Sequence, residues 1–431
     1  ASVGWKSMLY LDVTGRNDWS STLPAANRSY FYPSVSLSAI ISEMVKLPEI
    51  IDYLKIRSSW AMVGNDTSPY QLAYVYTSTT SMVNGGSVLE LKLPDTSPLC
   101  DMKPEETNSF EIGLDYRMFK NRFGIDFTYY RSETTNQILS ISTPVTSGFT
   151  NKTINAGKMQ SHGVELMITG TPIQTKDWQW DLNLNWGMNR TECAELYSSI
   201  SRHTLGSTRI ASVVVQDGGK FGDIVANNAF KRDEQGNILI DENGLPIKET
   251  DKVIGNMMPD WTGSVGTSLR WKDLSFSALV DIRYGGNFIS MTDNYATLSG
   301  NSVRSLAGRD GMVVKGIVES TGQPNTKEVT AEEYWTSVAG SNGVAEAFMY
   351  DATYIKLREL SLGWNLPKVW LKYTPLKSVK ISVVARDLFY LYKDAPVSAE
   401  AALSRADYAQ AFEYASMPPT RSFGFSLNVK F

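Results

Sequence analysis

The sequence predicts an all-β fold, a transmembrane antiparallel up-and-down β-barrel, and three observations support this. Apolar and polar residues alternate over about twelve segments, which is typical of strands with two different faces. The links between these segments are alternately short and long, and aromatic residues gather beside the short links. Since no run approaches the roughly 18 apolar residues that a membrane-spanning helix needs, any crossing of a membrane must use strands.

The strands are predicted from the alternation, which is clearest near residue 431. Phe423, Phe425, Leu427 and Val429 alternate with small or polar residues, so one face is apolar and the other is not. The same pattern places strands near 5–14, 31–43, 54–64, 106–118, 123–135, 158–170, 178–190, 260–271, 274–287, 353–366, 376–387 and 420–431.

The lengths of the links distinguish a barrel from other all-β folds. The short links are 44–53, 119–122, 171–177, 272–273 and 367–375, and the long links are 15–30, 65–105, 136–157, 191–259, 288–352 and 388–419. Outer-membrane barrels have tight periplasmic turns and long extracellular loops, whereas Greek-key sandwiches mix both kinds at each end. Short helices are expected only within links, at 48–54, 289–297, 330–338 and 398–412.

Aromatic residues indicate the two membrane interfaces. Trp261 and Trp271 lie on one face of a predicted strand, and ten residues at ~3.3 Å each span ~33 Å. A tilt of ~40° reduces this length to ~25 Å, the height of the lipid-facing band of a barrel. A single Trp would fit the core of a sandwich equally well, but further aromatic residues beside the short links favour a girdle: Phe119, Phe123, Trp178, Trp180, Trp364, Trp370 and Phe431.

Composition excludes several classes of protein. The chain has 45 acidic and 41 basic residues and a formal net charge of −4, which is too balanced for a nucleic-acid-binding protein. Its only cysteines and histidines are Cys100, Cys193, His162 and His203. These residues are too few for a disulfide framework, a Cys/His zinc site or a cysteine–histidine nucleophile, so we expect no metal and no cofactor.

No motif predicts catalysis. Glu105 and Glu106 are adjacent in a predicted strand, so their side chains would point to opposite faces. The glycine-rich stretch 217–223 lacks the Lys-Ser/Thr ending of a phosphate-binding loop. The acidic stretch 232–245 does not have the spacing of a calcium loop. We therefore expect that the protein is not an enzyme.

Charged residues on the polar faces of the strands would project into the lumen of a barrel. Such residues either pair with one another or with material that fills the pore, or they contact a transported substrate. The candidates for substrate binding are Asp281, Arg283, Arg386 and Asp387, and the other lumenal charges are Asp126, Glu165 and Arg270.

Several runs, spread over the whole chain, carry a resemblance to a known family. They are LDVTGRNDWSSTLP (11–24), LKIRSSWAMVGND (54–66), KPEETNSFEIGLDYRMFKNRFGIDFTYY (103–130), NAGKMQSHGVELMITGTPI (155–173), GNMMPDWTGSV (255–265), ATYIKLRELSLGWNLP (352–367), ARDLFYLYKDAP (385–396) and SMPPTRSFGFSLNVKF (416–431). The chain closely resembles the C-terminal half of the SusC/RagA family of TonB-dependent outer-membrane transporters from Bacteroidetes.

The resemblance implies a 22-stranded barrel to which this chain contributes about the last twelve strands. Family members carry a TonB-binding segment and a plug domain before the barrel, and neither is recognisable in residues 1–431. Because the first residues already resemble a barrel strand, we expect residues 1–431 to be one fragment of a barrel. The remaining barrel strands and the plug would then lie outside this sequence.

The function implied by the resemblance is TonB-dependent import of nutrient oligomers, oligosaccharide or oligopeptide, across the outer membrane of a Gram-negative cell. The implied partners are a SusD-like surface lipoprotein, TonB and outer-membrane lipid, and no nucleic acid. Phe431 resembles the terminal aromatic residue that marks barrels for insertion, although packing at the membrane interface would also explain it. Two alternatives remain open: a soluble all-β carbohydrate-active enzyme, and a passive porin or adhesin barrel.

Overall fold

The computed structural model describes residues 1–197 and 200–431. These residues form two compact units. Unit 1 comprises Ala1–Glu165, Asn189–His203 and Gln216–Gly219, and unit 2 comprises Leu166–Met188, Thr204–Val215 and Lys220–Phe431. Two long strands, β12 (Lys158–Gln174) and β13 (Trp178–Glu195), have residues in both units, so each unit contains a part of the main sheet.

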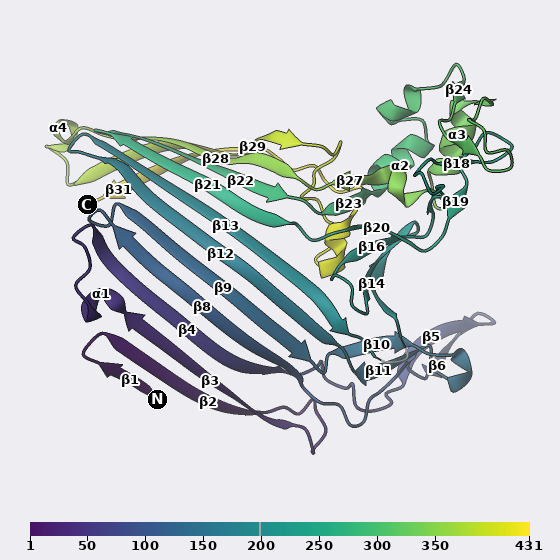
Figure 1. Cartoon of the computed structure of the whole chain (residues 1–431), viewed down its shortest axis with the longest axis horizontal. Coiled ribbons are helices and arrows are strands. Elements are labelled where there is room, and N and C mark those ends of the chain that lie inside the picture. The colour runs from purple at the N-terminus through teal and green to yellow at the C-terminus, as the bar shows by residue number, and fades with distance from the viewer. Residues whose placement is uncertain (198–199) are drawn as a thin grey trace. The chain divides into compact units, whose positions relative to one another are not determined.

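The main sheet has thirteen strands in chain order (Figure 1). Neighbouring strands are antiparallel, as in β2–β3 and β29–β31, and this arrangement confirms the predicted fold class. The strands are β1 (Ser2–Trp5), β2 (Leu9–Trp19), β3 (Ser29–Ile40), β4 (Ile51–Asn65), β8 (Glu105–Met118), β9 (Phe123–Thr135), β12 (Lys158–Gln174), β13 (Trp178–Glu195), β21 (Trp261–Trp271), β22 (Leu274–Tyr284), β28 (Tyr354–Asn365), β29 (Ser378–Lys393) and β31 (Ser422–Lys430).

The sheet has one strand more than the twelve that the sequence predicts, because the predicted strand at 5–14 joins the end of β1 to the first part of β2. That stretch contains a turn between β1 and β2, in which Lys6 and Ser7 have φ angles of 48° and 55°. β1 folds back along β2 and places Val3 opposite Leu11. Since alternation continues through so short a turn, the hydrophobic pattern alone does not reveal it.

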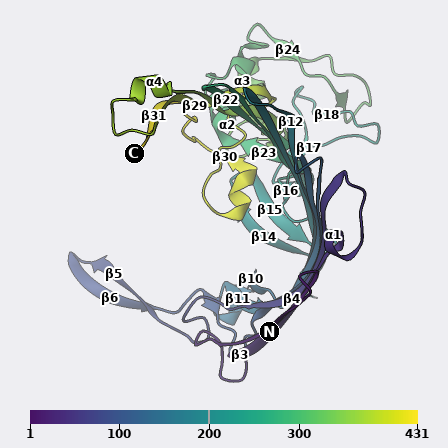
Figure 2. The same cartoon turned by 90° about the vertical axis from the view of Figure 1, so that its left-hand side faces the viewer.

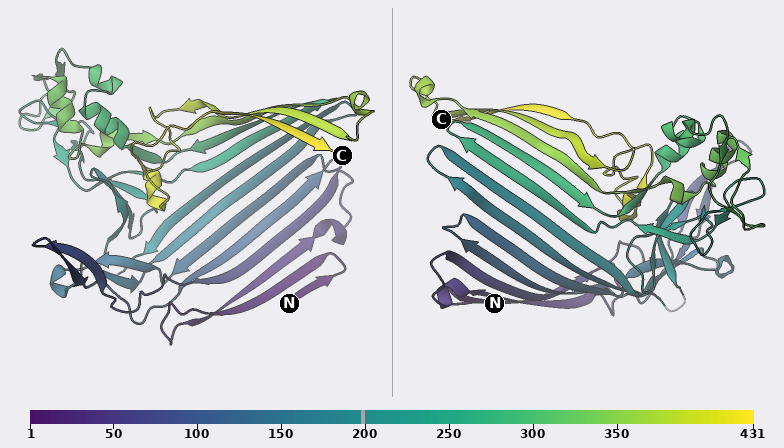
Figure 3. Two further views of the ribbon diagram at one scale, coloured as in Figure 1. Left: turned by 180° about the vertical axis from the view of Figure 1, so that it is seen from behind. Right: turned by 45° about the horizontal axis from the view of Figure 1, so that its top comes forward.

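The alternation of short turns and long loops is confirmed within each unit from β4 onward. The predicted long link 15–30 is wrong, because β2 extends to Trp19 and only residues 20–28 separate it from β3, fewer than the residues 41–50 between β3 and β4. In unit 1, residues 119–122 join β8 to β9, whereas 66–104 separate β4 from β8. In unit 2, residues 272–273 join β21 to β22, whereas 285–353 separate β22 from β28. The strands therefore have a turn end and a loop end (Figure 3).

The register gives the sheet of unit 2 one apolar and one polar face. Leu184 lies opposite Val265, and Val265 lies opposite Val280, so these side chains share one face. The apolar residues continue across β29 and β31, where Val383 is 55% exposed and Phe425 is 76% exposed. An exposed apolar sheet face of this extent is typical of strands that contact lipid.

Aromatic pairs lie at both ends of the strands of unit 2. Trp178 and Trp271 stack at the turn end with ring centroids 5.5 Å apart. Trp261 and Tyr284 stack at the loop end at 5.4 Å. Trp261 and Trp271 are the two ends of β21, as the predicted girdle spacing requires.

The loops contain shorter strands and helices. The strands are β5 (Thr77–Val83), β6 (Gly86–Lys92), β7 (Thr96–Ser97), β10 (Ile138–Ser142), β11 (Asn151–Asn155), β14 (Arg202–Ser207), β15 (Ala211–Gln216), β16 (Asp223–Ala226), β17 (Ala229–Phe230), β18 (Leu239–Ile240), β19 (Lys248–Glu249), β20 (Lys252–Asn256), β23 (Asn287–Ser290), β24 (Met312–Val313), β25 (Ile317–Val318), β26 (Glu328–Val329), β27 (Met349–Asp351) and β30 (Phe412–Glu413). The α-helices are α1 (Ile41–Met44), α2 (Met291–Leu298), α3 (Ala331–Val338) and α4 (Lys368–Leu371), and short 3₁₀ helices occupy Val145–Ser147, Val303–Leu306, Ala345–Phe348 and Asp407–Ala411.

The loops of unit 2 fold into a body with its own apolar core. The fully buried core residues include Ile210, Ile224, Ile289, Phe348 and Phe412, which come from segments far apart in the sequence. This core keeps the long loops ordered beside the ends of the strands.

The loops of unit 1 include a hairpin, β5–β6, whose side chains are mostly exposed to solvent. β5 and β6 are joined by Asn84 and Gly85, whose φ angles of 51° and 80° suit a two-residue hairpin turn. Leu89 and Leu91 on this hairpin are more than half exposed. Figure 2 shows the hairpin extending beyond β10 and β11 as a two-stranded ribbon.

Two of the four expected helices are confirmed and one is wrong. α2 and α3 match 289–297 and 330–338, and α3 begins with a capping box between Thr330 and Glu333. The helix expected at 48–54 is wrong, because Ile51 already begins β4, which pairs with β8. The helix expected at 398–412 is reduced to a 3₁₀ turn at Asp407–Ala411. Within the described ranges, the helices are too short or too polar to span a membrane.

Candidate functional site

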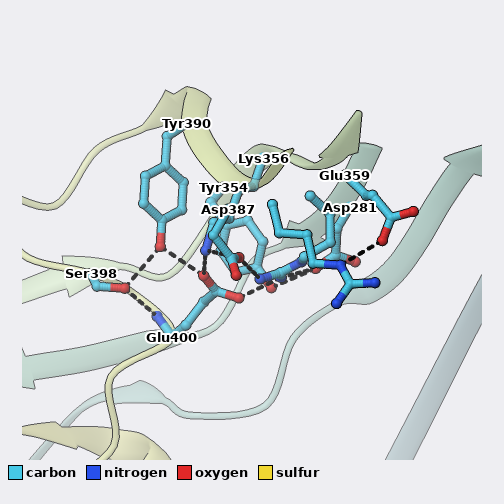
Figure 4. Close-up of polar contacts among 10 residues, drawn as sticks. Asp281, Tyr354, Lys356, Glu359, Asp387, Tyr390, Ser398 and Glu400 are labelled. Atoms are coloured by element: carbon cyan, nitrogen blue, oxygen red, sulfur yellow. Dashed lines mark hydrogen bonds and ion pairs between the residues drawn. The ribbon is translucent and has the colours of Figure 1, made fainter. Parts of the chain in front are cut away.

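A cluster of charged side chains lies near the loop ends of β22, β28 and β29. The register places Asp281 opposite Lys356, and Lys356 opposite Tyr390, so these three side chains share the polar face of the sheet. Figure 4 shows that they converge with Asp387 and with Glu400, a residue of the loop that follows β29.

Two cations and three carboxylates make up this cluster, the charged network. The Lys356 ammonium, only 2% exposed, lies 2.8 Å from Asp387 and 2.6 Å from Glu400. The Arg358 guanidinium lies 2.9 Å from Asp387 and 2.5 Å from Glu400, and it also pairs with Asp281. A buried ammonium costs several kcal/mol to desolvate unless carboxylates surround it, so Lys356 depends on its two partners.

Glu400 connects the network to the loop 394–421. Its carboxylate also accepts a hydrogen bond from the Tyr390 hydroxyl at 2.8 Å, and that hydroxyl lies 2.8 Å from the Ser398 hydroxyl (Figure 4). Burial raises the pKa of Glu400, but the hydrogen bonds from Arg358, Lys356 and Tyr390 together outweigh burial and hold the pKa below its usual value. The loop is therefore attached to the polar face by a carboxylate that stays ionised.

The structure places the four predicted substrate-binding residues in three different environments. Asp281 and Asp387 belong to the charged network. Arg386 forms a separate ion pair with Glu359 at 2.8 Å. Arg283 donates a hydrogen bond to the Met257 carbonyl oxygen at 2.8 Å, and its Nε has no hydrogen-bond partner.

Sequence reasoning missed three members of the network. Lys356 and Arg358 alternate with Ile355 and Leu357, so the period-two pattern could have identified them as lumenal residues. A β-bulge after Leu357 interrupts that pattern and obscures the signal. Glu400 lies in a loop without regular structure, and nothing local connects it to the strands.

Two of the other predicted lumenal residues, Asp126 and Arg270, have polar partners. Asp126 pairs with Arg57 at 2.7 Å, and Arg270 hydrogen-bonds to Gln179 at 3.4 Å. The interpretation that lumenal charges pair with one another therefore holds for Asp126.

A second polar cluster is buried within the loop body of unit 2. Asp293 accepts hydrogen bonds from Ser302, Arg304 and Tyr350 at 2.6 to 2.9 Å. Burial raises the pKa of Asp293, but these hydrogen bonds together lower it by more than burial raises it. The pKa therefore lies below its usual value. The Arg304 guanidinium also packs over the Phe348 ring at 5.1 Å, which ties this cluster to the apolar core.

The helices α2 and α3 border a cavity of about 570 Å³ in the same loop body. Its lining includes Thr297, Arg309, Glu332 and Trp335. Within the part of the chain that the structure describes, His, Cys, Asp and Glu residues form no group of three or more placed to hold a metal ion.

Comparison with known proteins places this arrangement in a family. Residues 1–370 match a family model described as TonB dependent receptor-like, beta-barrel. TonB-dependent receptor P3 of Formosa agariphila is 26% identical over 459 residues, a match that covers 99% of this chain and 44% of that protein. TonB-dependent receptor SusC of Bacteroides thetaiotaomicron is 25% identical over 385 residues, covering 84% of this chain and 36% of that protein.

Solved structures show the same fold. The structure of the RagAB peptide importer in its closed-closed state matches with a TM-score of 0.75 at 19% identity, covering 99% of this chain and 46% of that chain. Its open-open state matches with a TM-score of 0.73, also at 19% identity, covering 100% of this chain and 46% of that chain. The chain spans less than half the length of these relatives.

Proposed function

The chain belongs to the TonB-dependent receptor-like β-barrel family, and we propose that it forms the C-terminal part of a barrel that imports nutrient oligomers across the outer membrane. The cargo would be an oligosaccharide or an oligopeptide, and TonB would supply the energy. Family relatives are named as receptors, and RagAB as a peptide importer, so we infer transport without covalent chemistry.

The two-faced sheet is the single observation that carries this proposal. One face presents exposed apolar residues such as Val383 and Phe425, while the other carries the charged network of Asp281, Lys356 and Glu400. A soluble sandwich would bury its apolar sheet face against a second sheet. A transmembrane barrel exposes that face to lipid and keeps the polar face for its lumen.

We infer that further barrel strands and a plug domain complete the receptor. The main sheet is open at β1 and β31, and unpaired backbone groups at a sheet edge within a membrane cost several kcal/mol each. The chain also covers only 44% of receptor P3. Strands from outside this sequence would satisfy both edges, and the plug would carry the TonB contact.

A SusD-like lipoprotein is the partner that we propose for the loop end. The relatives SusC and RagAB support this assignment, as does the ordered loop body with its own core around Phe348 and Phe412. Long loops that fold into a stable body provide a surface for a partner protein, whereas barrel closure alone needs only short connections.

We propose that Asp281, Arg283, Arg386 and Asp387 line the path of the substrate near the loop end. Their position on the polar face supports this role. Ion pairing within the charged network orients Asp281 and Asp387, which would present a rigid hydrogen-bonding surface to a passing oligomer, and the exposed Arg386 would add a cation.

Phe431 is proposed as an assembly signal. It is 73% exposed and directly follows β31. A receptor that lacks only Phe431 should accumulate in the periplasm if the insertion machinery recognises this residue. If the side chain merely packs at the interface, its loss costs only about 2 kcal/mol, and normal amounts should reach the outer membrane.

Uptake in cells tests the proposed function. Cells that produce the complete receptor should accumulate fluorescent oligosaccharides or oligopeptides, and deletion of TonB should abolish the accumulation. Uptake that persists without TonB would instead indicate a passive porin. Recovery of the complete protein in the soluble fraction without detergent would favour the carbohydrate-active enzyme.

A further inference from the structure

Arg283 differs from the other three candidate residues, because Asp281, Arg386 and Asp387 each form an ion pair and Arg283 forms none within the described residues. Within the described residues, its guanidinium makes one hydrogen bond, to the Met257 carbonyl oxygen, and its Nε is buried without a partner. The nearby Asp351 carboxylate already accepts two hydrogen bonds from Thr353 and forms no ion pair with Arg283. Arg283 therefore keeps hydrogen-bonding capacity for an anion.

The register places a second cation in the same row. Arg283 lies opposite Tyr354 on β28, and Tyr354 lies opposite Lys393 on β29. Lys393 is exposed, and its ammonium hydrogen-bonds to the carbonyl oxygens of Pro396 and Val397 at 3.4 and 3.3 Å and lies 5.5 Å from the centre of the Tyr390 ring. Within the described residues it forms no ion pair with a carboxylate. Because neighbouring strands are ~4.8 Å apart, the backbones of Arg283 and Lys393 are separated by ~10 Å.

On the other side of Arg283, the row ends in a free hydroxyl. Thr262 on β21 is opposite Arg283, and its side chain is exposed and makes no hydrogen bond within the described part of the chain. The outer row, which we define as Thr262, Arg283, Tyr354 and Lys393, thus presents two cations and a hydroxyl donor without a carboxylate.

The neighbouring row, two residues nearer the middle of β22, contains paired charges. Asp281 and Lys356 lie there, and both belong to the charged network, in which each cation contacts carboxylates (Figure 4). Charges in that row are satisfied by the protein itself, whereas those of the outer row are not. An unpaired cation in a partly buried position is costly, which makes it a candidate for ligand binding.

From these contacts we propose that the outer row binds carboxylate groups of the substrate, so that the receptor selects acidic oligomers. A guanidinium binds a planar carboxylate through two parallel hydrogen bonds, and a second cation two strands away suits a chain with repeated carboxylates. This inference rests on the proposed import function and adds the chemical class of the cargo.

Binding to matched probes tests the inference. The complete receptor in detergent is titrated with hexagalacturonate against maltohexaose, and with an alternating Gly-Glu peptide against an alternating Gly-Ser peptide. At low salt, at least one acidic probe should bind about tenfold more tightly than its neutral counterpart. The carbohydrate and peptide arms distinguish the two sources of carboxylate.

Three variants locate the effect. Arg283→Gln should weaken binding of the acidic probe about tenfold more than binding of the neutral probe and so remove the preference, while Arg283→Lys should restore part of the preference. Lys393→Gln changes an exposed side chain without a buried contact and should weaken acidic binding about threefold. Arg117→Gln removes the same charge at the turn end of β8 and should have no effect.

Several results would overturn the inference. These are equal binding of acidic and neutral probes, an equal loss of both probes in Arg283→Gln, or an unchanged preference in Lys393→Gln. If neutral oligomers still bind or are imported, only the charge preference fails and the proposed function stands. If no oligomer of either kind binds, the proposed function fails as well.

Discussion

At the residue scale, the polar face depends on a few side chains that each serve several partners. Glu400 alone connects Lys356, Arg358 and Tyr390. Since Lys356 is 2% exposed, every carboxylate near it affects the free energy of the folded loop. Removing one such carboxylate should therefore destabilise the attached loop.

Glu400→Gln should loosen the loop 394–421. Loss of the charged hydrogen bonds to Lys356 and Arg358 should destabilise the attached loop by about 2 kcal/mol, because Asp387 still compensates Lys356. Limited proteolysis should then cut between 394 and 421 faster than in the wild type. Glu359→Gln, which removes an exposed ion pair with Arg386, is the matched control, and equal cleavage of the two variants would contradict the role of Glu400.

Acidification should release the same loop. The pKa of Glu400 in the folded protein lies below its usual value of 4.5, so its ionic contacts stabilise the loop fully above 4.5 and lose this effect as the pH falls through the lowered pKa. Hydrogen exchange of residues 398–400 should rise in that range. In Glu400→Gln the rise should be absent, and a persisting rise would assign it to another group.

At the element scale, strands could be predicted and the loop body could not. Alternation is a local property, so β13 and β21 were placed to within a few residues, whereas β1 was hidden by its short turn. The core around Phe348 and Phe412 joins segments far apart in the sequence, and no local pattern encodes such contacts. Pairing of β4 with β8 is also a contact between distant segments, so the local pattern at 48–54 predicts a helix where the structure has the start of a strand.

Asp293→Asn should destabilise the loop body. The change leaves the Arg304 guanidinium without its carboxylate inside a polar cluster whose Asp293 side chain is only 8% exposed. Breaking a buried ion pair costs about 3 to 5 kcal/mol, so peptides from 285–353 should exchange amide hydrogens faster. Glu332→Gln on the exposed side of α3 should not, and protection that is unchanged in Asp293→Asn would refute the prediction.

Val383→Arg should impair insertion of the receptor. Val383 is exposed on the apolar face of β29 between Leu362 and Phe425, and an arginine on the lipid face costs about 2 to 4 kcal/mol near the midplane. The amount of folded, heat-modifiable receptor in the outer membrane should fall. Ser382→Arg places the same charge on the polar face one residue away, and an equal loss for both variants would contradict the assignment of the faces.

At the scale of the whole molecule, the strands from β4 onward follow one arrangement: the shorter turns lie at one end of the strands and the long loops at the other. The sequence alone was sufficient for this polarity, because the lengths of links are visible without a structure. The substrate could not be predicted, because the outer row around Arg283 depends on which strands pair.

The orientation of these two ends in the membrane is the central claim, and labelling of intact cells tests it most directly. Cys100 is an exposed free thiol in the loop 66–104, and it should react with a membrane-impermeant maleimide. In a Cys100→Ser background, a cysteine substituted for Asn121 in the turn 119–122 should react only after the cells are permeabilised. Labelling of the Asn121 site but not of Cys100 in intact cells would invert the topology and contradict the proposed import path.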